Sequence, residues 1–128
     1  MAYHISKTVN MSFDDAILKV KEELGKEGFG VLTEIDVKGT LKKKLDVDFK
    51  KYTILGACNP NFAYKALQEE DKIGTMLPCN VLVQETAHGQ VEVSSIDPLE
   101  SMMAIQNPNL KDIAIQVQRK LKKVVEKI

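Results

Sequence analysis

The strongest pattern in the sequence is an apolar stripe with helical spacing near its carboxyl-terminal end. Apolar residues recur at intervals of 3, 1, 3, 4, 3, 1 and 3, at Leu110, Ile113, Ala114, Val117, Leu121, Val124, Val125 and Ile128. This spacing places them on one side of an α-helix, with most of the intervening lysines facing water. The chain must therefore fold around one long helix that packs into the core.

Other helix starts are marked by a capping residue followed by proline, because proline suits the first helical position. The three pairs are Asn59-Pro60, Asp97-Pro98 and Asn107-Pro108. Near the amino-terminal end, Ser12 with Asp15 three residues later resembles a capping box. An apolar stripe follows, and Gly25 and Gly28 are expected to end that helix.

A short helix is expected after Gly39-Thr40. It would bury Leu41 and Leu45 beneath the lysines at 42–44, which we interpret as a solvated face.

Strand patterns occupy most of the remaining sequence. The expected strands cover residues 2–9, 29–38, 52–58, 76–85 and 90–96. The last two form a hairpin with a tight turn near His88-Gly89. The order strand, helix, strand, helix, strand, helix, strand, strand, helix predicts an α+β fold, with a mixed sheet of about five strands and helices packed on it. We expect residues 1–128 to form a single domain.

The charge balance excludes some classes of function. Eighteen basic and eighteen acidic side chains cancel, and Arg119 is the only arginine. A nucleic-acid-binding protein would show a basic excess, so no nucleic-acid partner is expected. No apolar run approaches the roughly 18 residues that span a bilayer, and the first residues lack an apolar signal core. We therefore expect no membrane partner and a cytoplasmic location.

Cys58 and Asn59 are the most suggestive pair of residues. Cys58 ends an expected strand, and Asn59 is the expected N-cap of the next helix. A helix amino terminus lowers the pKa of a nearby thiol and favours bound anions. The pair could therefore contact a small ligand, although a buried structural cysteine beside an ordinary cap fits the same pattern.

Cys79 follows Pro78 inside an apolar run. The proline places this position at a sheet edge, a strand start or a bulge. If the strands containing Cys58 and Cys79 are parallel, the thiols lie roughly 20 Å apart and form no disulfide. An antiparallel arrangement would reopen that question, but we expect no intramolecular disulfide.

Other polar and sulfur-containing residues give weaker signals. Glu34 and Asp36 share a strand face, which we interpret as exposed, with Glu34 kept as a candidate ligand contact. Met102 and Met103 would fill core gaps or cover a subunit contact, or else form a partner or soft-metal surface. The sequence has no phosphate-binding loop, nucleophile elbow or zinc-protease motif, so no catalytic residue or cofactor is assigned and an enzyme is not favoured.

Several segments together resemble a known family. They are GFGVLTEIDV at 28–37, LKKKLDVDFKKYTILGACNP at 41–60, IGTMLPCNVLVQE at 73–85 and IDP at 96–98. The chain resembles the bacterial and archaeal domain-of-unknown-function family 302. The resemblance implies a TATA-binding-protein-like fold with added helices and a homodimer, but no established activity. It adds Asn80 to the candidate site, because the family motifs fall on Cys58-Asn59-Pro60 and Pro78-Cys79-Asn80.

These observations favour a homodimeric module that binds a small ligand or a partner without its own catalysis. The ligand would lie near Cys58-Asn59 and Pro78-Cys79. The alternative is a thiol-dependent redox or soft-metal protein that uses one or both cysteines, since thiolates suit Cu(I) and Zn. A purely structural interaction module is a third possibility.

Overall fold

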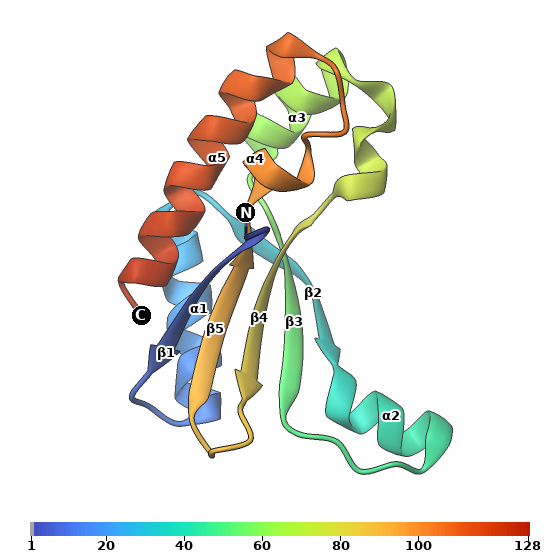
Figure 1. The fold of residues 1–128 in the computed structure, drawn as a ribbon. Helices are drawn as coiled ribbons and strands as arrows, with labels where there is room; N and C mark the ends of the chain where they lie inside the picture. Colours follow the sequence, from blue (N-terminus) through green and yellow to red (C-terminus); the bar gives the residue numbers. More distant parts are fainter. Residues whose placement is uncertain (1) are drawn as a thin grey trace.

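The computed structural model describes residues 2–128 (Figure 1). The strands are β1 (His4–Val9), β2 (Gly30–Asp36), β3 (Tyr52–Cys58), β4 (Cys79–Glu85) and β5 (Val91–Ile96). The helices are α1 (Phe13–Lys26), α2 (Val37–Leu45), α3 (Pro60–Glu69), the 3₁₀ helix η1 (Asp71–Met76), α4 (Pro98–Ser101) and α5 (Pro108–Glu126).

The five strands form one sheet in the order β1-β5-β4-β3-β2. All four neighbouring pairs of strands are antiparallel. The prediction of a mixed sheet is therefore wrong, because the order of elements along the chain does not specify the direction in which each strand runs. The predicted α+β class and five strands are confirmed. The element order is also confirmed, with η1 added between α3 and β4, and with the short helix expected at Asp97-Pro98 present as α4 before α5.

The main core lies between one face of the sheet and the helices α1 and α5. Leu55, Val81 and Val93 on the sheet are completely buried, as are Leu24 of α1 and Leu121 of α5. Burying such a side chain fully contributes roughly 1.5–3 kcal/mol, so this layer dominates the stability of the fold. The apolar stripe predicted for the last helix is confirmed as its packing surface.

Most of the predicted helix caps are present. The Ser12 hydroxyl accepts a hydrogen bond from the Asp15 N–H at 3.1 Å, and Asn107 accepts one from the Asn109 N–H at 3.0 Å. The buried Asp97 carboxylate caps α4 and also accepts two hydrogen bonds from the Gln118 amide, at 3.0 and 2.9 Å. Asp97 therefore fixes the short α4 against the long α5.

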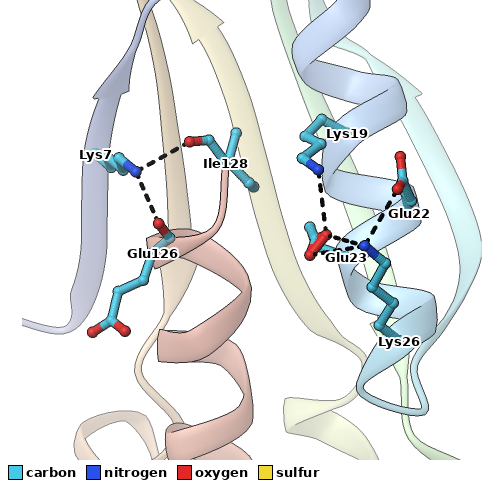
Figure 2. A network of polar contacts seen from close by, with 7 residues as sticks. All are labelled: Lys7, Lys19, Glu22, Glu23, Lys26, Glu126 and Ile128. Atoms are coloured by element: carbon cyan, nitrogen blue, oxygen red, sulfur yellow. Dashed lines mark hydrogen bonds and ion pairs between the residues drawn. The ribbon is translucent and has the colours of Figure 1, made fainter.

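Two polar clusters secure the ends of the long helices (Figure 2). The Lys7 ammonium on β1 donates to the backbone oxygens of Glu126 and Ile128 at 2.9 and 3.1 Å, where a helix presents its unpaired carbonyls. On α1, Glu23 is only 3% exposed and lies between Lys19 and Lys26. The hydrogen bond from Lys26 lowers the pKa of the Glu23 carboxyl.

The prediction for α2 is wrong in two respects. The helix begins at Val37, before Gly39, because the Asp36 carboxylate accepts a hydrogen bond from the Gly39 N–H at 3.0 Å. None of its residues is buried, and Leu45 is 66% exposed. The physical reason is its position, since α2 extends beyond the end of the sheet (Figure 1).

The face of the sheet opposite α1 and α5 is more accessible. Alternation along the strands places Ile35, Ile54 and Leu82 on this outer face. Ile35 is 47% exposed, and the other two are half-buried. Within residues 2–128, no helix is long and apolar enough to cross a membrane.

Candidate functional site

Four of the six candidate site residues line one small cavity. Cys58, Asn59, Pro78 and Cys79 surround a space of about 40 Å³, together with apolar side chains that include Phe62. A single water molecule needs roughly 10–15 Å³ on this measure. The cavity is therefore too small, in this conformation, for more than the tip of a ligand.

The antiparallel pairing of β3 and β4 brings the two cysteines close together. Ala57 lies directly opposite Cys79, so the end of β3 adjoins the start of β4. The parallel arrangement that would separate the thiols by about 20 Å is thus wrong. Both cysteines are free. Because side chains alternate along a strand, Cys79 shares the core face with Ala57, whereas Cys58 is one residue out of phase for a cross-strand disulfide.

The environment of Cys79 keeps its thiol protonated. Burial raises its pKa to about 11, with a smaller contribution from Cys58. The thiolate is the form that attacks electrophiles. Cys79 is therefore a poor nucleophile at neutral pH, and it serves as a small apolar wall of the cavity.

Asn59 occupies the predicted N-cap position of α3, but its side chain makes no cap hydrogen bond. Its amide instead donates to the Glu27 carbonyl oxygen at 3.3 Å. Gly28, which has φ +85°, lies beside it, and a Cβ there would be 3.2 Å from the Asn59 amide nitrogen. Asn59 thus ties the end of α1 to the start of α3.

Pro78 immediately precedes β4, so of the three positions expected for it, a sheet edge, a strand start or a bulge, it occupies a strand start. Its peptide bond with Leu77 is cis. The proline ring packs against Gly56, where an added Cβ would lie 2.8 Å from the Pro78 Cγ and would also collide with the Thr33 side chain. Gly56 was not among the residues predicted from the sequence, although a glycine inside a strand signals such a close approach.

The other two candidate residues lie elsewhere. Asn80 pairs with Gly56 across the strands and is exposed. Glu34 forms an ion pair with Lys21 of α1 at 3.0 Å and is about half exposed. Neither residue lines the cavity.

A much larger hollow lies beside this cavity, between α5 and the segment 99–108. It encloses about 600 Å³. Its apolar lining consists of Leu99, Met102, Met103, Ile105, Pro108, Leu110 and Ala114. Met102 and Ala114 line both spaces and so form the wall between them. The sequence pointed to Met102 and Met103 as a core or contact surface, but the hollow that they border could not be predicted from it.

The described residues 2–128 contain no group of three or more His, Cys, Asp or Glu side chains placed to hold a metal ion.

Comparison with known proteins identifies the family. The family described as "Domain of unknown function DUF302" matches residues 5–128. The chain belongs to this family. The fold is similar to the crystal structure of an uncharacterized conserved DUF302 protein from Bacillus stearothermophilus, with a TM-score of 0.93 and 29% sequence identity. The match covers 99% of this chain and 98% of that one. No curated protein matches.

The resemblance to family 302 is therefore confirmed for nearly the whole chain. The structural match includes the segments that surround both spaces, because it leaves out only 1% of the chain. Between this chain and the Bacillus stearothermophilus protein, the backbone that positions the cavity lined by the two cysteines is maintained, whereas most side chains differ.

Proposed function

We propose that this DUF302 protein is a binding module that takes a small, mainly apolar ligand into the hollow between α5 and the segment 99–108. The observation that carries the proposal is the size and lining of that hollow. Its volume of about 600 Å³ is filled by no side chain and is bordered mostly by apolar residues. Ligand sites are typically apolar concavities of roughly 300–1,000 Å³ with a few polar groups.

The polar residues at the hollow indicate which polar groups the ligand would carry. Glu100, Gln106, Asn107 and Lys111 line it beside the apolar residues. Asn107 is already engaged, because it caps α5 and donates to the Glu69 carbonyl at 2.8 Å. The remaining three offer both donors and acceptors. A ligand with an apolar body and one uncharged polar end suits this lining.

Met102 lies between the hollow and the cavity that the two family motifs of the candidate site line. It separates the hollow from the cavity lined by Cys58, Asn59, Pro78 and Cys79. Methionine is flexible and adapts to irregular spaces. A change of the Met102 rotamer would join the two spaces and let the end of the ligand touch Cys79. This contact requires no thiol chemistry.

The proposal is tested by titrating the protein with the fluorescent apolar probe N-phenyl-1-naphthylamine. Met103 lines the hollow and is 70% exposed, so Met103→Glu should fold while placing a charge beside the probe. We expect saturable binding of one probe per chain, weakened roughly tenfold or more by Met103→Glu, since desolvating a charge is costly.

Met76→Glu is the matched control, because Met76 is 38% exposed and does not line the hollow. It should bind the probe like the unaltered protein. Non-saturable fluorescence, or equal loss of binding in both variants, would contradict the proposed site.

We also propose that the module functions as a homodimer, with a second copy covering α2 and the outer face of the sheet. α2 buries none of its residues within one chain. Leu32, Ile35 and Leu45 expose 69%, 47% and 66% of their surface. In a two-fold dimer, the same surface patch of each copy contacts the other copy, so these exposed side chains would become buried in both copies. The family resemblance supports a second copy as the partner.

Sedimentation equilibrium tests this arrangement. Ile35→Glu places a charge in the middle of the patch and should shift the protein from dimer to monomer. Leu18→Glu is the control, since Leu18 is 64% exposed on α1, away from the outer face. A monomeric unaltered protein, or an Ile35→Glu variant that stays dimeric, would refute the interface.

A further inference from the structure

A third hollow lies on the other side of Asn59, where α1 ends and α3 begins. It encloses about 590 Å³ and differs from the apolar hollow in its lining. Lys26 of α1, Lys65 of α3 and Lys120 of α5 border it, and Glu27 is its only acidic residue. Three cations from three separate elements thus converge on one concave surface of a chain whose formal net charge is zero.

The ion pairs around this hollow leave positive charge unneutralised. Glu27 lies 3.8 Å from the Lys120 ammonium and 3.7 Å from that of Lys123. The Lys26 ammonium is held by Glu22 and Glu23 at 3.4 and 3.0 Å, and Glu23 is shared with Lys19 (Figure 2). With Lys65 included, this group contains five lysine side chains and three glutamate side chains, which leaves a surplus of two positive charges.

Lys65 is the cation that is free to bind. Within residues 2–128 it forms no ion pair, and its ammonium lies 5.7 Å from the centre of the Phe62 ring. The side chain is exposed at the mouth of the hollow. It can therefore turn toward an anion without breaking a salt bridge.

The backbone at the start of α3 adds hydrogen-bond donors. Pro60 has no N–H, and the Ala63 N–H is bonded to the Asn59 carbonyl oxygen at 2.9 Å. Because the Asn59 side chain is turned to Glu27, it does not cap the N–H groups of Asn61 and Phe62, and both of these residues line the hollow. Uncapped amides at a helix amino terminus favour a bound anion.

We propose that this lysine-lined hollow binds the phosphate group of a small phosphorylated molecule. A phosphate dianion matches the surplus of two positive charges, and its oxygens can accept from lysine ammonium groups and backbone N–H groups together. Tyr64, which is 66% exposed, and Phe62 provide aromatic surface beside it for an attached planar group. The site is separate from the apolar hollow of the proposed function.

The test uses ¹H–¹⁵N NMR titrations of the full chain with phenyl phosphate, inorganic phosphate and benzoate at constant ionic strength. We expect saturable shifts of the Asn61 and Phe62 amides with both phosphates. Tighter binding of phenyl phosphate identifies a phosphate ester as the ligand, whereas equal affinity identifies phosphate itself. Benzoate binding as tightly as phenyl phosphate would overturn the assignment to phosphate.

Lys65→Gln should weaken phosphate binding about tenfold, because one charge-assisted hydrogen bond is lost. Lys72→Gln is the matched control, since Lys72 is exposed on η1 and does not line the hollow. Both variants should keep the dispersed spectrum of the folded protein. Absence of saturable shifts at Asn61 and Phe62, or equal affinities in both variants, would overturn the proposal. Met103→Glu should not alter phosphate binding, which separates this site from the apolar hollow.

Discussion

The layer between the sheet and its two long helices differs sharply from the corner formed by α3, η1, α4 and the start of α5. The layer contains a continuous cluster of buried residues from β1 to α5, whereas the corner buries only Ala66, Ile73 and Leu110 in its own cluster. The 600 Å³ hollow borders the corner. The buried layer thus carries the stability of the fold, and the proposed ligand would bind in the less densely packed region, since loosely packed regions adapt at low cost.

The largest expected contrast is between large-to-small substitutions in the two regions. Leu55→Ala removes a completely buried side chain from the layer and should lower the free energy of unfolding by about 2–5 kcal/mol. Ile105→Ala beside the hollow should cost less than about 1 kcal/mol, because its side chain is only partly buried. Urea denaturation measures both values, and equal losses would remove the distinction.

The thiol of Cys79, which lines the small cavity between the buried layer and the corner, should be unreactive. A pKa of about 11 for Cys79, against an ordinary value of 9.0, lowers its thiolate fraction at pH 7 roughly a hundredfold. Iodoacetamide should therefore modify Cys79 only after denaturant is added, whereas the half-buried Cys58 should react first. Peptide mass spectrometry distinguishes the two sites. Rapid modification of native Cys79 would instead favour thiol-dependent chemistry.

Glycine substitutions offer a third contrast. Gly56→Ala should lower the free energy of unfolding by about 1–3 kcal/mol, because its Cβ would collide with Thr33 and Pro78. Gly74→Ala in η1 meets no atom within 4 Å and should leave stability unchanged or slightly higher. Thermal unfolding of the two variants provides the measurement. A harmless Gly56→Ala would show that β2, β3 and Pro78 are less tightly packed than the structure indicates.

The smallest effect concerns the pH dependence of stability. The pKa of Glu23 is lowered in the folded protein by its hydrogen bond with Lys26. The stability that the Glu23 carboxylate adds to the fold is therefore fully present above the unfolded pKa of about 4.3. It is lost as the pH falls through the lower pKa of the folded protein.

Glu23→Gln should accordingly reduce the stability measured at pH 7 and flatten the loss of stability on acidification. Glu126→Gln serves as the control, because the Glu126 carboxylate forms no ion pair among the described residues. Parallel acid-unfolding curves for Glu23→Gln and the unaltered protein would contradict the assigned role of Glu23.

Local features of the fold could be predicted from the sequence. The caps at Ser12, Asp97 and Asn107 and the stripe of α5 depend on residues a few positions apart, and the structure confirms them. The predicted burial of Leu45 is wrong because periodicity defines a helix face but not what covers it.

Features of the site that depend on tertiary structure could be predicted only in part. Family motifs singled out Cys58 and Cys79, but their proximity follows from the antiparallel direction of β3 and β4, which no local pattern specifies. The hollow follows from how the segment 99–108 packs against α5. Asn59 was correctly placed at the start of α3, yet its side chain is bonded to Glu27 on a distant segment.

The methionine methyl groups report most directly on whether the hollow beside α5 binds an apolar ligand, as we propose. Met102 and Met103 line the hollow, whereas Met11 and Met76 do not. With ¹³C-methyl-methionine labelling, N-phenyl-1-naphthylamine should shift the Met102 and Met103 signals in a saturable manner and leave those of Met11 and Met76 unchanged. Unmoved Met102 and Met103 signals at saturating probe, or shifts confined to Met11 and Met76, would show that the probe does not bind in this hollow.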